Sequence, residues 1–107
     1  MDSVSGLVFG LRIEDVQAIQ KVFAQYPKIE KVLIYGSRAK GNFKNGSDID
    51  LTIVAPMMNL TELFAIDNEL DDLDLPYKID LSICHQIENP NLVDHINRVG
   101  KVFYSSG

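Results

Sequence analysis

The sequence predicts a small α/β domain of the α+β type, in which helices pack against a small mixed β-sheet. Short apolar runs typical of strands alternate along the chain with longer segments in which apolar residues recur every three or four positions. The inferred order is helix, strand, loop, strand, helix, strand, helix. Strands and helices mixed in this order favour a sheet covered by helices.

The length of 107 residues fits one domain and leaves little room for a second, so we expect residues 1–107 to form a single domain. Residues 1–10 are small, apolar and irregular in pattern, and we expect them to be a flexible leader. A domain of this size buries only part of its apolar surface, so its stability should be modest. A partner that covers exposed apolar surface would therefore stabilise it.

Helices are predicted where apolar residues share one face and where capping residues mark the ends. The predicted helices are residues 13–26, 59–72 and 90–99. Asn59 followed by Glu62 has the pattern of a capping box, and Asn89 followed by Pro90 places a cap before a proline at the first helical position. The apolar face expected for the last helix consists of Leu92, Val93, Ile96 and Val99.

Strands are predicted at residues 32–35, 48–54, 77–84 and 102–104. The run from Val32 to Tyr35 is continuously apolar, which is typical of a buried central strand. In residues 77–84 polar and apolar side chains alternate, as expected for a strand with two different faces. Residues 37–46 hold glycine, asparagine and basic side chains, so we expect mostly loop with at most one helical turn.

The composition argues against several classes of protein. The chain carries 15 acidic and 10 basic residues, a net charge of −5, whereas general nucleic-acid binders usually show a basic stripe, so a long nucleic acid is not the expected partner. The single cysteine, Cys84, cannot form a disulfide within the chain, which favours a reducing compartment. The N-terminus lacks a secretory signal pattern, and no apolar run approaches the roughly 20 residues that span a bilayer. We expect a cytoplasmic protein that does not bind a membrane.

Asp48 and Asp50 are the most informative pair in the sequence. They lie two residues apart at the start of a predicted strand, so their side chains share one face of the sheet. Two neighbouring carboxylates repel each other unless they are protonated or bound to a cation. The pair is therefore a candidate site for a hard divalent cation such as Mg²⁺, which usually takes one or two carboxylates plus substrate phosphates.

Asp80 is a candidate third carboxylate. It lies between Ile79 and Leu81 in a strand that otherwise has a buried pattern, where a lone aspartate is costly without a partner. If this strand lies beside residues 48–54, Asp80 joins the aspartate pair. Three carboxylates can hold two metals about 3.5–4 Å apart, the spacing that stabilises attacking and leaving oxygens in phosphoryl transfer. Taken alone, Asp80 is equally consistent with a hydrogen-bonded acid in the core.

The segment after the first predicted strand has features of a phosphate-binding loop. Gly36-Ser37 follows the strand directly, glycine permits close approach of the backbone to a phosphate, and Ser37 adds a hydroxyl donor. The nearby cations are Arg38, Lys40 and Lys44. A triphosphate could be held here while metals bridge it to the carboxylates, although each feature alone is common in ordinary turns and solvated loops.

Two rival motifs fail at residues that they require. Gly36 and Gly41 have the spacing of a P-loop, but Asn42 stands where the lysine is needed. An EF-hand loop beginning at the aspartate pair also fails, because Thr52 and Ile53 replace a required ligand and the glycine. The loop and the aspartates therefore have to be interpreted together.

Together these residues resemble the signature of the DNA polymerase β-like nucleotidyltransferases. Residues 36–41 (Gly-Ser-Arg-Ala-Lys-Gly) and 46–51 (Gly-Ser-Asp-Ile-Asp-Leu) resemble its Gly-Ser and Asp-x-Asp motifs, and residues 78–81 (Lys-Ile-Asp-Leu) resemble its third-carboxylate strand. The resemblance covers nearly half of the chain, and the whole chain is similar to the minimal nucleotidyltransferases, or MNT proteins, which carry the catalytic domain alone. One departure is Lys40, where the group often has arginine; the charge is kept without a bidentate grip on phosphate.

The resemblance implies a polymerase β-like fold and transfer of a nucleoside monophosphate to an acceptor hydroxyl, with ATP as the expected donor and two Mg²⁺ ions. By match to the motif, Asp48, Asp50 and Asp80 are the expected catalytic and metal-binding residues, and Asp80 also helps to activate the acceptor. The expected nucleotide-binding residues are Gly36, Ser37, Arg38, Lys40 and Ser47.

The resemblance also implies a partner, because minimal members often pair with a small helical HEPN protein. In such toxin–antitoxin pairs the MNT protein is the antitoxin, and in some cases it adenylylates a tyrosine of the HEPN ribonuclease. Two other interpretations stay open: an antitoxin that neutralises a helical partner by occlusion without needing catalysis, and a metal- or nucleotide-sensing domain with no transfer reaction. A homo-oligomer is also open, because a chain without an accessory domain needs a partner or a second copy to complete the acceptor site.

The remaining polar candidates carry weaker signals. His85 and His95 lack metal-ligand spacing to a cysteine or to each other, so we expect them to be surface or hydrogen-bonded side chains rather than ligands. Tyr35 ends the apolar run that precedes Gly36, and we expect it in the core.

Overall fold

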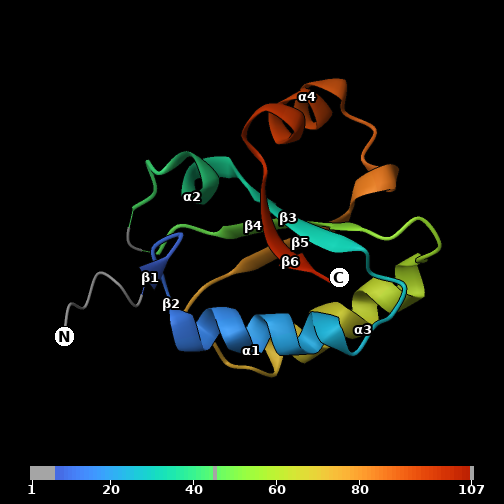
Figure 1. Ribbon diagram of the computed structural model, residues 1–107, viewed down its shortest axis with the longest axis horizontal. Coiled ribbons are helices and arrows are strands. Elements are labelled where there is room, and N and C mark those ends of the chain that lie inside the picture. Colours follow the sequence, from blue (N-terminus) through green and yellow to red (C-terminus); the bar gives the residue numbers. More distant parts are fainter. Residues whose placement is uncertain (1–6, 45, 107) are drawn as a thin grey trace.

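A four-stranded sheet divides the described part of the chain, residues 7–44 and 46–106, into two layers in this computed structural model (Figure 1). The strands are β3 (Lys31–Tyr35), β4 (Ile49–Val54), β5 (Ile79–Ile83) and β6 (Lys101–Ser105). The helices on one face are α1 (Ile13–Ala24) and α3 (Leu60–Asp71). Those on the other side are α2 (Gly36–Lys40) and α4 (Pro90–Val99). The predicted α+β class with a small mixed sheet is confirmed.

The strands follow the order β5-β4-β3-β6 across the sheet. β3 pairs antiparallel with both β4 and β6, whereas β4 and β5 are parallel. A parallel pair needs a crossover connection, and α3 supplies it between β4 and β5. The sheet therefore has β3 and β4 at its centre, which confirms the prediction of a buried central strand at residues 32–35.

The two faces of the sheet differ in polarity. The fully buried residues of β4 on the face toward α1 and α3 are Ile49, Leu51 and Ile53. Phe23 of α1 and Ile66 of α3, both 0% exposed, belong to the same core. Because side chains alternate along a strand, Asp50 and Thr52 point to the opposite face. The sheet thus has an apolar face and a polar face, and α4 lies over the polar one.

The predicted caps of two helices are confirmed. Asn59 Oδ1 accepts a hydrogen bond of 2.9 Å from Glu62 N, and Glu62 Oε1 accepts one of 3.1 Å from Asn59 N, which together form the capping box of α3. Asn89 Oδ1 accepts a bond of 2.9 Å from Asn91 N, and Pro90 is the first residue of α4. Among the described residues, no helix combines the length and the apolar character needed to cross a membrane.

The leader expected at residues 1–10 overlaps a regular element at residues 7–10. Strands β1 (Leu7–Val8) and β2 (Leu11–Arg12) form a hairpin with a two-residue turn, and Leu11 is 0% exposed. The turn residues Phe9 and Gly10 have φ values of 56° and 74°, the positive values that such tight hairpins require. Burial of Leu11 in the core gives the segment a fixed position. Residues 1–6 lie outside the described part of the chain.

One further prediction is confirmed and one needs correction on the polar side of the sheet. Residues 36–40 form a short helix, α2, which ends at Gly41 with φ 87°, as the expected single helical turn within a mostly loop segment. A short 3-10 helix, η2 (Cys84–Gln86), follows β5 where the sequence predicted the strand to continue to residue 84. Local composition predicts such short helices poorly, because one turn needs few hydrogen bonds.

The predicted apolar face of α4 is only partly buried. Ile96 is 4% exposed, whereas Val93 is 37% exposed, and Leu92 and Val99 are intermediate. The helix packs over a polar sheet face that offers few apolar partners.

β5 lies at the sheet edge, so Asp80 is exposed and not buried as its neighbours in sequence suggested.

We expect Asn59→Ala to lower the free energy of unfolding by about 1 kcal/mol, because it removes the side-chain acceptor at the start of α3. Asn68→Ala on the same helix is the matched control, since Asn68 is exposed in the helix interior and alanine is the better helix former there. Urea unfolding of both variants measures the difference. Equal unfolding free energies would contradict the role of the capping box.

Candidate active site

The three predicted catalytic carboxylates lie in the same region, at one end of the β4–β5 pair. In the parallel register of these strands, Asp50 lies directly beside Asp80. Asp48 is one residue before β4, whose start is fixed by a hydrogen bond of 2.8 Å from Ile49 N to Lys78 O. The condition that the sequence set for Asp80, a strand lying beside residues 48–54, is therefore met. The catalytic role of the three aspartates stays a prediction.

The Asp50 carboxyl lies in a crowded acidic environment. Burial raises its pKa above the ordinary value, and the neighbouring carboxylates of Asp80 and Asp48 raise it further. His95 opposes this rise in pKa, but its effect is the smallest of the four. Repulsion between carboxylates is relieved by a bound cation, so the charges around Asp50 favour one.

A polar row continues across the same face of the sheet behind the carboxylates. Tyr35 is the register partner of Asp50 on β3 and is 8% exposed. Burial raises the pKa of the Tyr35 phenol, the Ser82 hydroxyl lowers it, and the carboxylates of Asp80 and Asp50 raise it. Ser82 Oγ donates a bond of 2.9 Å to Thr52 Oγ1, which is 0% exposed. These hydroxyl groups extend the polar surface of the sheet beside the carboxylates.

Gly36 is packed tightly against Asp50. Its φ is 73°, which L side chains rarely adopt, and a Cβ at this position would meet Asp50 Oδ2. The Gly36 N–H donates to His95 Nε2 on α4 at 3.2 Å. Ser37, the next residue, is partly buried in the first turn of α2. The Gly-Ser turn predicted to bind phosphate therefore lies directly beside the predicted metal-binding carboxylate.

Arg38 has a position that the sequence did not predict. It is 3% exposed, and its Nε and Nη2 donate to Ser47 O at 3.1 and 2.9 Å while Nη1 donates to Phe9 O at 3.0 Å. The guanidinium lies over the rings of Phe43 and Tyr77, 5.1 and 5.2 Å from their centroids. Burial lowers its pKa, but an arginine remains charged in proteins.

The contacts of Arg38 speak against its predicted role as a phosphate ligand. Its donors are used by two backbone carbonyls, one in the β1–β2 hairpin and one immediately before Asp48. We therefore interpret Arg38 as a cross-link that holds the chain leading into β4. Its nucleotide contact stays an untested prediction.

The remaining predicted nucleotide ligands lie farther out. Lys40 is exposed at the end of α2. The Ser47 hydroxyl accepts a hydrogen bond of 2.9 Å from Lys44 N, so it closes the turn before β4. A hydroxyl that accepts this bond can still donate its own proton to a phosphate. The roles of both residues stay predictions.

The donor set fits a divalent cation that is completed by substrate. Asp50 and Asp80 are adjacent, and Asp48 is near enough for its charge to act on Asp50. In residues 7–44 and 46–106, however, no three acidic, histidine or cysteine side chains converge closely enough to form a metal cage by themselves. Mg²⁺ usually combines one or two carboxylates with substrate phosphates, so a partial protein site is what this ion needs.

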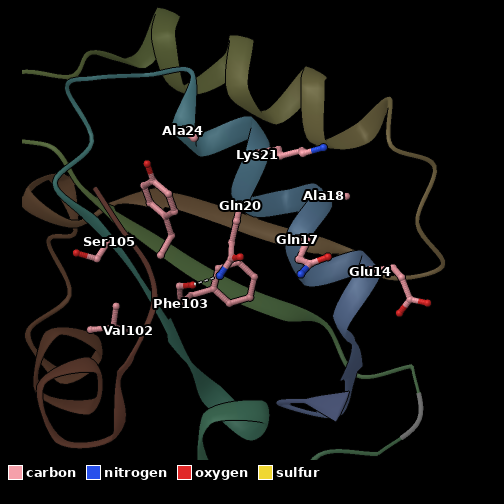
Figure 2. Close-up of a pocket in the computed structure, with 10 residues that line it drawn as sticks. Glu14, Gln17, Ala18, Gln20, Lys21, Ala24, Val102, Phe103 and Ser105 are labelled. Atoms are coloured by element: carbon pink, nitrogen blue, oxygen red, sulfur yellow. Dashed lines mark hydrogen bonds between the residues drawn. The ribbon is translucent and has the colours of Figure 1, made fainter. Parts of the chain in front are cut away.

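The groove shown in Figure 2 lies away from these carboxylates. It has a volume of about 700 Å³ and runs between α1 and the edge strand β6. Across it, Gln20 Nε2 donates to Phe103 O at 2.8 Å. The charged residues at its lining are Glu14 and Lys21, an arrangement without paired carboxylates. The site residues predicted from the sequence therefore lie at the β4–β5 end and not in this groove.

A glycine-serine turn packed against paired carboxylates on a mixed sheet fits the predicted class of nucleotide-transferring proteins, and sequence comparison agrees with that class. Residues 17–107 match the family described as polymerase beta, nucleotidyltransferase. The match covers most of the chain, so the chain belongs to the polymerase β nucleotidyltransferase family. It is also 35% identical over 72 residues to a candidate protein adenylyltransferase of Methanocaldococcus jannaschii, a stretch that is 66% of this chain and 72% of the relative. The prediction of a nucleotidyltransferase is confirmed.

Solved structures with a similar fold come from toxin–antitoxin complexes. A chain of a toxin–antitoxin complex with AMP-PNP superposes with a TM-score of 0.68 and 22% identity, over 84% of this chain and 73% of that one. A chain of a Shewanella oneidensis complex between a tri-AMPylated HEPN toxin and an MNT antitoxin gives a TM-score of 0.64 and 19% identity, over 87% of this chain and 71% of that one. At these identities the likeness establishes the fold.

Sequence reasoning missed two residues beside the site. His95 was expected to be a surface or hydrogen-bonded side chain, and it does form a hydrogen bond, but the donor is the Gly36 N–H of the Gly-Ser turn. Tyr35 was expected in the core, and it is buried, but it also lies beside Asp50 in the sheet and contacts the His95 ring. Because Tyr35 directly precedes Gly36 in the sequence, its location beside the predicted site could have been predicted. No local signal exists for His95, because 59 residues separate it from Gly36.

We expect Gly36→Ala to be more destabilising than Gly41→Ala and to impair any function of the Asp50 carboxylate. Both glycines have positive φ, so both substitutions share a strain of about 1–2 kcal/mol. A Cβ at Gly41 meets nothing within 4 Å, whereas one at Gly36 displaces Asp50. The excess loss at Gly36, about 1–3 kcal/mol as for other overpacked sites, is read from denaturant unfolding. Equal losses would show that the turn can move away from Asp50 freely.

We expect Arg38→Lys to lower the free energy of unfolding by about 2–3 kcal/mol. Lysine cannot reproduce the fork on Ser47 O and the bond to Phe9 O, and buried hydrogen bonds of charged groups are worth about 1.5–3 kcal/mol. Arg98→Lys is the control, because Arg98 is exposed in a surface pair with Asp94 and should change stability by less than about 0.5 kcal/mol. An unchanged free energy of unfolding in Arg38→Lys would contradict the cross-linking role and favour the predicted role of Arg38 in nucleotide binding.

Proposed function

We propose that this protein transfers AMP from ATP to a hydroxyl of a small helical HEPN-type partner, using Mg²⁺ held by Asp48, Asp50 and Asp80. The observation that carries the proposal is the pairing of Asp50 with Asp80, with the Gly36 turn packed against Asp50. Carboxylates at this density favour a hard divalent cation, and such a cation binds substrate phosphates as its remaining ligands. The donor phosphates would then lie beside Ser37.

The relatives support this choice of donor and acceptor. One toxin–antitoxin complex of similar fold was solved with AMP-PNP, an analogue of ATP, and another contains an AMPylated HEPN toxin with an MNT antitoxin. The relative from Methanocaldococcus jannaschii is described as a candidate protein adenylyltransferase, which matches a protein acceptor. These likenesses favour adenylyl transfer to a protein over transfer to a small molecule.

In the proposed reaction, the acceptor hydroxyl oxygen attacks the α-phosphorus of ATP, and the bond from that phosphorus to the pyrophosphate oxygen breaks. Pyrophosphate leaves with the electron pair, and Asp80, exposed at the sheet edge, accepts the hydroxyl proton. Ser37 contacts the triphosphate through its hydroxyl. Mg²⁺, when bound by the aspartates, supplies positive charge that offsets the charge developing on the phosphates.

We expect Asp50→Asn to lower adenylyl transfer by more than about 100-fold, because charge stabilisation by a metal is worth several kcal/mol. The protein is co-expressed with the product of its neighbouring gene, and the intact mass of that partner reports each added AMP. Asp94→Asn is the matched control, since the Asp94 side chain is 66% exposed on α4 and its partner is Arg98. Transfer by Asp94→Asn should equal that of the unaltered protein.

The same experiment distinguishes the occluding antitoxin from the enzyme. If the Asp50→Asn protein leaves the partner unmodified but still co-purifies with it and neutralises it, occlusion is favoured. Full transfer by Asp50→Asn would contradict the assignment of the site. An unmodified partner that does not co-purify would move the search for the acceptor to RNA ends and small molecules.

A further inference from the structure

His95 connects helix α4 to the turn that begins α2. The Gly36 N–H donates to His95 Nε2 at 3.2 Å. Because Nε2 is the acceptor in this bond, the neutral ring carries its proton on Nδ1. The imidazole is partly buried, and the contact crosses from the C-terminal part of the chain to the residue that lies against Asp50.

A second contact places the same ring against the end of β3. The His95 and Tyr35 rings meet edge to face, with centroids 6.2 Å apart and an interplanar angle of 80°. Tyr35 is the register partner of Asp50. His95 therefore touches two consecutive residues, one paired with Asp50 across the sheet and one packed against its carboxylate.

The bond to Gly36 has a specific local purpose. The first N–H groups of a helix have no acceptor within the helix, and the Gly36 N–H is one of these in α2. A partly buried N–H without an acceptor is costly, so the imidazole satisfies a group that would otherwise favour a different turn. Ile96, the next residue, is 4% exposed and fixes α4 at the same point.

We propose that His95 is a positioning residue for nucleotide transfer: it holds the Gly36 amide, and through it the Gly36-Ser37 turn, in place beside Asp50. The consequence for catalysis rests on the function proposed above. In this role His95 acts through Gly36 and not as a ligand of the substrate. Gly36 is packed directly against the Asp50 carboxylate, so the turn cannot shift toward it. If the turn shifts away, Ser37 moves relative to the carboxylates.

The test compares two substitutions that differ in one property. His95→Gln keeps an acceptor at about the reach of Nε2, whereas His95→Leu has similar bulk and no acceptor. His85→Leu is the matched control, because His85 is exposed on η2. Hydrogen exchange of the Gly36 amide, measured by NMR on the protein alone, tests the contact without any requirement for activity.

For His95→Leu we expect faster exchange of the Gly36 amide and a KM for ATP with Mg²⁺ about three- to ten-fold higher, with a smaller change in kcat, as for loss of one hydrogen bond. His95→Gln should restore both values to within about two-fold, and His85→Leu should leave them unchanged. A purely structural role for the imidazole would lower stability without this difference between KM and kcat.

Three results would overturn the proposal. Equal impairment of His95→Gln and His95→Leu would show that the acceptor is not the important property. Unchanged amide exchange in His95→Leu would show that the bond does not hold the turn. A lower KM in His95→Leu would show that His95 competes with the nucleotide for the amide. If the unaltered protein transfers no AMP, the proposed function fails, while amide exchange still decides whether His95 holds Gly36.

Discussion

The parallel pairing of β4 with β5 sets Asp50 beside Asp80, and the geometry of the site depends on this register. Like charges directly opposite each other on adjacent strands destabilise a sheet. The sheet accepts them because the buried residues on its other face are apolar and pack against α1 and α3. Stability gained on one face thus holds together charges on the other, and a cation bound between the carboxylates would relieve the repulsion that remains.

A second constraint acts on the segment that leads into β4. The buried Arg38 guanidinium joins the β1–β2 hairpin to Ser47 O, one residue before Asp48, and lies between Phe43 and Tyr77. Tyr77 in turn lies two residues before the start of β5. One side chain therefore contacts the segments that lead into both strands that carry the aspartates.

The parts of the fold that were predictable are those set by local pattern. The capping box at Asn59 and the alternation in β4 depend on residues within a few positions, so the sequence specifies them directly. The burial of Arg38 and the contact of His95 depend on pairs 9 to 59 residues apart, and no spacing rule connects them. The pattern of residues 77–84 predicted a strand correctly but not its place at the sheet edge, because that depends on the order of strands.

The arrangement of layers also limits how an acceptor can reach the site. α1 and α3 cover the apolar face, and β3 closes the side of β4 opposite to β5 (Figure 1). Asp80 is exposed because β5 is an edge strand, so an acceptor hydroxyl of the proposed partner would approach from this edge or from the side of α4. The partly exposed apolar residues of α4, among them Val93 at 37%, lie on that side of the sheet. A partner that brings its hydroxyl to Asp80 from the side of α4 would thus meet the helix that holds Gly36 through His95.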